Sequence, residues 1–261
     1  MTTQLAERVD LEHLPFQLDQ GIGERASIGV IVLATDQTLE HEFRVLLKVP
    51  GVAFYESRIS NENAITRENL QAMEGRIGAA AGLILPGVPL DVVAFGCTSA
   101  SMVIGEERVF ELIKEARPEV ACTTPITAAL AGLRAMRARR IALLTPYRAD
   151  INHFIREYIE ARGFEVPVMG SFNEEDDRRA ARIDLPSIRQ AGVDLLQRPG
   201  VDALFVSCTS LRLAEVIGEI EAETGKPATS SNHALAWHCL RLAGIDDRSP
   251  EHGSLYQMDL A

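Results

Sequence analysis

The sequence predicts an α/β protein with two pseudo-symmetric lobes, each doubly wound around a central parallel sheet. Three observations predict this fold class. Short apolar runs alternate with helical patterns, a Cys-Thr-Ser motif follows an apolar run in each half of the chain, and the two halves match at a nearly constant offset. Runs that are apolar at every position indicate strands covered on both faces, as parallel strands are.

Four strands are predicted in each half. They are expected at residues 28–34, 52–55, 91–95 and 120–123 in the first half and at residues 141–144, 164–169, 202–206 and 226–230 in the second. Helices are expected at residues 99–116, 128–139, 150–162, 186–197, 211–224 and 233–243. Gly163 and Gly244 directly follow two of these patterns and act as helix stops.

An internal repeat relates the two halves. In both Cys-Thr-Ser segments, which begin at Cys97 and Cys208, an aspartate stands six positions before the cysteine. Upstream, Thr35 and Thr145 end similar apolar runs, and the offset between these threonines differs by only one position from the offset between the cysteines. Such a period is too long for a solenoid and indicates a duplicated lobe.

The repeat divides the 261 residues into three parts. We expect an N-terminal arm at residues 1–25, a first lobe at residues 26–139 and a second lobe at residues 140–261, whose last helix crosses over to the first lobe. In open parallel sheets, ligands bind beyond the carboxyl ends of the strands. Two facing lobes would therefore bring both Cys-Thr-Ser segments to one cleft.

Composition excludes several classes of function. The formal net charge is −11 and aromatic residues make up 5% of the chain, which argues against nucleic acid or an anionic membrane as a partner. The four cysteines are far apart and form no CxxC pair or Cys/His cluster, so no metal site and no disulfide framework is expected. A reduced, cytoplasmic setting without a signal peptide fits best. No phosphate-binding glycine loop follows a strand, and we expect no cofactor.

Cys97 and Cys208 are the candidate catalytic residues. Each follows a predicted strand and precedes a predicted helix, whose positive end would lower the pKa of a thiol. One such cysteine is often only a small buried hydrophobe, and Cys122 and Cys239 fit that role. Two at matched positions suit carbon-acid chemistry, in which one thiolate removes a proton beside a carboxylate and the other thiol returns one, or one thiolate adds covalently.

These motifs carry a family resemblance. The two Cys-Thr-Ser segments and Thr-Pro-Tyr at residues 145–147 resemble the aspartate/glutamate racemase superfamily, in the branch of maleate cis-trans isomerases and arylmalonate decarboxylases. LATDQT at residues 33–38, ILPG at 84–87, CTSASMVIG at 97–105 and EDDR at 175–178 resemble ectoine-utilisation proteins of that branch. The resemblance implies a racemase-like fold and a cofactor-independent isomerase or racemase with two cysteines.

The resemblance also implies a role for each matching residue. Cys97 would be the nucleophile or first base and Cys208 the opposing acid, while Tyr147 would donate its hydroxyl to the substrate or instead cap the cleft. The hydroxyl residues that would cradle the carboxylate oxygens are Thr98, Ser99, Thr209 and Ser210. The expected partner is a small carboxylic or amino acid, and we expect a homo-oligomer.

Two aspartates depart from the maleate isomerase pattern. Asp36 and Asp177 stand where those enzymes carry amide donors, and an ionised aspartate only accepts hydrogen bonds and repels a carboxylate. We therefore expect little activity on maleate and a preference for a substrate with an amine or amidine. Asp177 has a plainer alternative, because residues 176–177 could belong to a solvated acidic loop.

Three other functions remain open from the sequence. An arylmalonate-type decarboxylase would use Cys208 alone to protonate an enediolate. A two-lobed cytosolic binding protein would close around a small molecule without chemistry. A dithiol redox protein is the least favoured, because Cys97 and Cys208 lie on separate lobes and form no CxxC pair.

Overall fold

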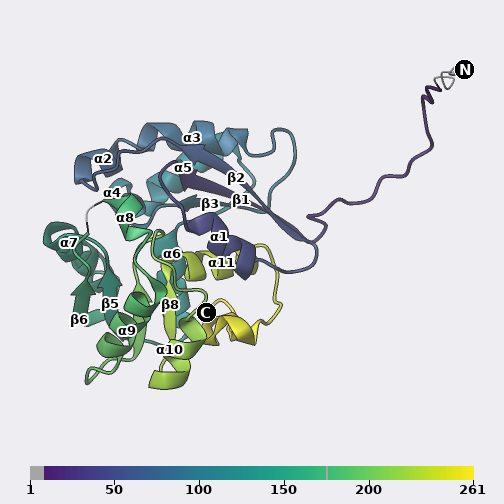
Figure 1. Cartoon of the computed structure of the whole chain (residues 1–261). Helices are drawn as coiled ribbons and strands as arrows, with labels where there is room; N and C mark the ends of the chain where they lie inside the picture. Colours follow the sequence, from purple (N-terminus) through teal and green to yellow (C-terminus); the bar gives the residue numbers. More distant parts are fainter. Residues whose placement is uncertain (1–8, 175) are drawn as a thin grey trace, which may run out of the picture.

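The computed structural model describes residues 9–174 and 176–261, and these form two four-stranded parallel sheets (Figure 1). Residues 1–8 of the expected arm and Glu175 lie outside the described residues. The first sheet has the order β2-β1-β3-β4 and the second the matching order β6-β5-β7-β8. The strands are β1 Ala26–Leu33, β2 Val52–Ile59, β3 Val92–Gly96, β4 Ala121–Thr123, β5 Arg140–Thr145, β6 Glu165–Ser171, β7 Ala203–Val206 and β8 Ala228–Ser230. Every neighbouring pair of these strands is parallel, which confirms the predicted fold class.

Helices connect the strands of each sheet. In the first half they are α1 Leu39–Leu46, α2 Arg67–Gln71, α3 Glu74–Leu83, α4 Thr98–Ile104, α5 Glu106–Ala116 and α6 Pro125–Ala135. In the second half they are α7 Ala149–Glu160, α8 Asp177–Ala180, α9 Leu185–Leu196, α10 Ile217–Thr224 and α11 Ser231–Leu242, followed by the 3-10 turns η1 Pro250–His252 and η2 Ser254–Gln257.

Several helix predictions need correction. The predicted helix at residues 99–116 is two helices, because Gly105 between α4 and α5 has a φ of 96°. The helix predicted at residues 211–224 begins only at Ile217, and the chain before it is irregular. The predicted helix at residues 128–139 is α6, which begins at Pro125 because Thr124 caps it. Helices α1, α2, α3 and α8 had not been predicted.

The two sheets share one hydrophobic core. Alternate residues of β1 face opposite sides: Val30 joins a cluster that continues to Phe205 of the second sheet, whereas Ile31 packs in a separate cluster with Phe95. Helices α6 and α11 pack against each other, and α11 contacts strands of both sheets (Figure 1). The last helix of the second half thus lies against the first sheet. No helix among the described residues has the length and hydropathy to cross a membrane.

Candidate active site

A small cavity lies where the carboxyl ends of the two sheets meet. Leu33 at the end of β1, Cys97 after β3, Tyr147 after β5 and Cys208 after β7 all line it. Its enclosed space is about 30 Å³, which is room for one or two water molecules. The central strands of both sheets therefore deliver one thiol each to the same narrow space.

Most of the predicted site residues line this cavity. They are Cys97, Thr98, Ser99, Tyr147, Asp177, Cys208 and Thr209. Asp36 and Ser210 do not line it but lie directly behind it: the Ser210 hydroxyl donates to Asp177 over 2.5 Å, and the charge of Asp36 acts on both thiols. The structure thus gathers all nine predicted residues in one place, in two layers.

Cys97 and Cys208 are both buried thiols. Cys97 caps α4, with Sγ 3.9 Å from the Ser99 hydroxyl. Cys208 lies in an irregular segment, where the Ser210 N–H points at Sγ over 3.4 Å. Burial, with a smaller contribution from the charge of Asp177, raises the pKa of each thiol to about 12.

The expectation of a lowered thiol pKa is therefore wrong. The positive end of a helix lowers a thiol pKa and loss of solvation raises it, and loss of solvation outweighs here because Cys97 and Cys208 are only 4% and 3% exposed. Helix α4 has seven residues, and no helix begins at Cys208.

Tyr147 faces Cys208 from the end of β5. Its hydroxyl interacts with the Cys208 thiol and lowers the pKa of that thiol, while burial and the nearby sulfur raise the Tyr147 pKa well above its ordinary value. Asn152 fixes the turn, because its amide donates to the Tyr147 carbonyl over 2.7 Å. Tyr147 is therefore a neutral donor held at the second thiol.

Asp177 joins the two lobes. One carboxylate oxygen accepts from Thr35 at the end of β1 over 2.7 Å, and the other accepts from Ser210 of the second lobe over 2.5 Å. Asp177 is 8% exposed, so it does not belong to a solvated acidic loop. Its neighbour Asp176 pairs instead with Arg178 at the surface.

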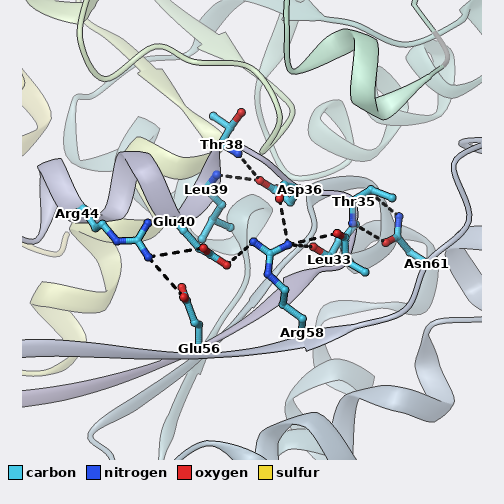
Figure 2. A network of polar contacts seen from close by, with 11 residues as sticks. Leu33, Thr35, Asp36, Thr38, Leu39, Glu40, Arg44, Glu56, Arg58 and Asn61 are labelled. Atoms are coloured by element: carbon cyan, nitrogen blue, oxygen red, sulfur yellow. Dashed lines mark hydrogen bonds and ion pairs between the residues drawn. The ribbon is translucent and has the colours of Figure 1, made fainter.

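Asp36 shapes the end of the first strand (Figure 2). Oδ1 accepts from the N–H groups of Thr38 and Leu39 over 2.8 Å each and so starts α1. Oδ2 is buried without a hydrogen-bond partner, and burial raises the Asp36 pKa to about 6. The Asp36 carbonyl accepts from Arg58, whose guanidinium also pairs with Glu40.

The hydroxyl residues have unequal freedom to bind a carboxylate. Thr98 donates its hydroxyl proton to Ser231 over 2.7 Å, and Ser210 donates to Asp177. The hydroxyl of Ser99 faces only the Cys97 sulfur. Ser99 is therefore better placed to donate to a ligand than Thr98 or Ser210, whereas the Thr209 hydroxyl interacts with Asp36 and lowers the pKa of that carboxyl.

The segment that closes the cavity was missed in the sequence. Residues between β2 and α3 line the cavity, namely Asn61, Glu62, Ala64, Ile65, Asn69, Leu70 and Met73. Ala64 pairs with Asp176 of the second lobe in an antiparallel bridge, and the Arg67 guanidinium lies 4.4 Å from the centre of the Phe154 ring. The one available signal was the place of this segment after the carboxyl end of a strand.

A buried carboxylate in α1 holds the segment that carries Cys208. Oε1 of Glu42 accepts from the N–H groups of Leu213 and Ala214 over 2.7 Å each, and Oε2 accepts from the Asn232 amide over 2.8 Å. The Asn232 amide also donates to the Thr209 carbonyl. Burial raises the Glu42 pKa. In the sequence, Glu42 was indistinguishable from a residue on the polar face of a helix.

The described residues contain no group of three or more His, Cys, Asp or Glu side chains suited to a metal ion. The titratable groups that line the cavity are two thiols from opposite lobes, the Tyr147 phenol, and the carboxylates of Glu62 and Asp177. This set can remove and return protons or form one covalent bond to sulfur.

Comparisons with known proteins agree with this arrangement. The arylmalonate decarboxylase family matches residues 29–256. A maleate isomerase of Pseudomonas putida is 28% identical over 245 residues, which cover 87% of this chain and 96% of that one. The crystal structure of the maleate isomerase Iso from Pseudomonas putida S16 has a TM-score of 0.81 and 26% identity, covering 88% of this chain and 98% of that chain.

A second solved structure shows chemistry at a cysteine. It is the Nocardia farcinica maleate cis-trans isomerase, in a cysteine-to-serine variant with a covalently bound succinylcysteine intermediate. Its TM-score is 0.80 at 26% identity, and the match covers 89% of this chain and 98% of that chain. The predicted branch of maleate isomerases and arylmalonate decarboxylases is confirmed. With a match that runs from β1 to η2 and includes both Cys-Thr-Ser segments, the chain belongs to the arylmalonate decarboxylase family.

Proposed function

We propose that the protein is a cofactor-independent isomerase or racemase that acts at the carbon next to a carboxylate of a small acid. The observation that carries the proposal is the meeting of Cys97 and Cys208, one from each lobe, in a single narrow cavity. Two thiols facing one carbon provide a base on one side and an acid on the other.

The proton-transfer route uses the two cysteines in turn. The thiolate of Cys97 removes the proton beside the carboxylate, and the electrons of that C–H bond move into the carboxylate to give an enediolate. Cys208 then gives its thiol proton to the opposite face of the same carbon. One proton is taken and one is returned, so the product is an isomer of the substrate. Ser99 would donate a hydrogen bond to an enediolate oxygen.

An addition route suits an unsaturated acid. The Cys97 thiolate forms a bond to an alkene carbon, and the π electrons move into the conjugated carboxylate. Rotation about the resulting single bond and loss of the thiolate restore the alkene in the other geometry. The succinylcysteine of the Nocardia farcinica relative supports this route.

We place this reaction in the cytoplasmic breakdown of ectoine or hydroxyectoine, with the enzyme as a homo-oligomer. The support is the resemblance of residues 33–38, 84–87, 97–105 and 175–178 to ectoine-utilisation proteins.

Hydrogen exchange in deuterated water tests the proposal. The protein is incubated with a panel of small amino acids, saturated dicarboxylic acids and unsaturated acids, and proton NMR follows the signal of the carbon beside the carboxylate. We expect exchange or isomerisation of at least one acid, and a loss of about 10³-fold or more in Cys97→Ser and Cys208→Ser. Cys239→Ser, within α11, is the matched control. Full turnover by Cys97→Ser would contradict the two-thiol mechanism.

Chelation tests the cofactor independence separately. The activity found should survive EDTA and extensive dialysis. Loss on chelation that a divalent ion restores would overturn this part of the proposal.

Decarboxylation is the second candidate, because the cavity has an apolar wall. Leu33, Ile65, Leu70 and Met73 line the cavity, and an apolar wall destabilises a carboxylate that is about to leave as CO₂. A decarboxylase would release CO₂ from a substituted malonate and would need Cys208 but tolerate Cys97→Ala. Binding of acids without turnover of any kind would instead favour a binding protein.

A further inference from the structure

The cavity carries negative charge and no lining cation. Among the described residues that line it, Asp177 and Glu62 are carboxylates, and none is lysine, arginine or histidine. The guanidinium groups next to lining residues in the chain have other partners: Arg178 pairs with Asp176, Arg148 pairs with Asp150, and Arg67 lies over the Phe154 ring. A ligand with two carboxylates would meet no counter-charge here.

Asp177 has capacity for a cation. A carboxylate has about four acceptor positions, and Asp177 uses one on each oxygen, for the hydroxyls of Thr35 and Ser210. Those two donors come from opposite lobes and fix the carboxylate at the cavity wall. An ammonium group in the cavity would find free lone pairs on both oxygens.

Asp177 also acts on every reactive group of the site. Its charge raises the pKa of Cys97, Cys208, Tyr147 and Asp36, in each case in addition to burial. A cation seated beside Asp177 would cancel this contribution and would attract a thiolate by itself. The group best placed to bind a cation therefore adds to the effect of burial, which is the main reason that both thiols hold their protons.

We infer that the substrate is a monocarboxylic acid bearing a protonated amine or amidine, and that its cation pairs with Asp177 and thereby activates the two thiols. The cation keeps its proton throughout and takes no part in the bond changes. An acid without such a group leaves the Asp177 charge uncompensated and the thiols protonated. The inference rests on the proposed function only in taking the two thiols as the reacting groups.

Binding of a matched pair of small acids tests the ligand class. The probes are 3-aminopropanoate and succinate, which differ in carrying an ammonium or a second carboxylate. Calorimetry should show at least tenfold tighter binding of 3-aminopropanoate to the wild type, and Asp177→Asn should lose that preference. Asp176→Asn, which removes a surface carboxylate one residue away, should keep it. Tighter binding of succinate to the wild type, or an unchanged preference in Asp177→Asn, would overturn the inference.

Alkylation without ligand tests the activation. At pH 8, mass-spectrometric mapping with limiting iodoacetamide should show Cys97 and Cys208 labelled severalfold faster in Asp177→Asn, because removing the Asp177 charge lowers the pKa of both thiols and raises the thiolate fraction. Cys122 supplies the internal reference and should not change. Equal rates at Cys97 and Cys208 in the two proteins would reject activation through Asp177. Circular dichroism checks that the variant is folded, and its amide can still bond with Thr35 and Ser210.

The two proposals fail differently. If hydrogen exchange occurs only with amine-free acids, the isomerase proposal stands and the cation inference fails. If 3-aminopropanoate binds through Asp177 but no acid exchanges hydrogen, the inference on ligand class stands and the isomerase proposal fails.

Discussion

The two Cys-Thr-Ser segments have the same sequence but different conformations. After Cys97 the chain enters α4 at once, whereas residues 209–216 after Cys208 are irregular and α10 begins at Ile217. Both segments end in Val-Ile-Gly, but Gly218 stands two positions further from Cys208 than Gly105 does from Cys97. The repeated motif therefore determines where each thiol sits and leaves the following backbone to other interactions.

The hydrogen bonds that hold the backbone after each cysteine come from different parts of the molecule. A helix satisfies most of its own N–H groups, so the first segment needs little from outside. In the second segment, the N–H groups of Leu213 and Ala214 donate hydrogen bonds to Glu42 of the other lobe. The position that matches Glu42 in the second lobe, at the offset between Thr35 and Thr145, is Asn152. Its side chain forms hydrogen bonds within its own lobe. The backbone after Cys208 thus depends on a side chain of the other lobe, whereas the bond from Thr98 to Ser231 joins the first segment to the other lobe through side chains only.

The largest expected effect comes from removing Glu42. Glu42→Ala leaves two N–H groups and the Asn232 amide buried without their acceptor, so we expect the free energy of unfolding to fall by about 3–5 kcal/mol. Urea denaturation measures this fall in the free energy of unfolding. Glu42→Gln keeps one acceptor oxygen and should cost about 1 kcal/mol.

The same variant separates the two thiols. In Glu42→Gln, iodoacetamide should label Cys208 faster while Cys97 keeps its rate, because only the second segment is released. Asn152→Ala is the matched control from the second lobe and should disturb Tyr147 instead. Equal acceleration at both cysteines would show that the two segments are not held independently.

Replacing Gly105 and Gly218 by alanine should change the free energy of unfolding in opposite directions. Gly105 has φ 96° and ψ 131°, which a residue with a side chain rarely adopts, so Gly105→Ala should lower the free energy of unfolding by about 2 kcal/mol. Gly218 lies inside α10 with open space around it, so Gly218→Ala should raise it by about 0.5 kcal/mol. Thermal unfolding of both variants measures these changes. A stabilised Gly105→Ala would contradict the statement that the backbone between α4 and α5 requires glycine.

The sequence predicted the features that repeat and missed those that join the lobes. Periodicity and the nearly constant offset between the halves were enough for both sheets and for the meeting of Cys97 with Cys208. The helical propensity of Leu-Arg-Leu-Ala-Glu predicted a helix after Cys208, and the bonds from Glu42 override it. Nothing local in the sequence marks such a partner 171 residues away.

The site prediction failed on electrostatics for a similar reason. The position before a helix was visible in the sequence, but the extent of burial and the convergence of Asp36 and Asp177 on both thiols were not. These depend on packing between segments far apart in the chain. The cavity residues 61–73 were missed because they have neither periodicity nor a motif.

The two thiols should react alike despite their different backbones. Burial is the largest cause of the raised pKa at both Cys97 and Cys208, and both reach about 12. Cys122 is half-buried with a pKa of about 11, so at pH 9 iodoacetamide should label it about tenfold faster than either site cysteine. Cys239, fully buried in α11, should be slowest. A rate for Cys97 more than tenfold above that of Cys208 would show that the start of α4 activates its thiol.

The ends of the first strands differ between the lobes, because the first lobe has Asp36 where the second has Pro146. The folded pKa of Asp36 is about 6, above the ordinary 3.8. The folded protein therefore holds this proton more tightly than the unfolded chain. The stability that this proton contributes is full below pH 4 and is lost as the pH rises through 6.

Asp36→Asn does not titrate and keeps an acceptor for Thr38 and Leu39. Its stability relative to the wild type should rise by about 3 kcal/mol between pH 4 and pH 8, because a pKa difference of one unit corresponds to about 1.4 kcal/mol. Asp184→Asn, at the exposed cap of α9 where the pKa is lowered, should show the opposite pH trend. A pH-independent difference for Asp36→Asn, measured by urea denaturation, would mean that folding does not raise the Asp36 pKa.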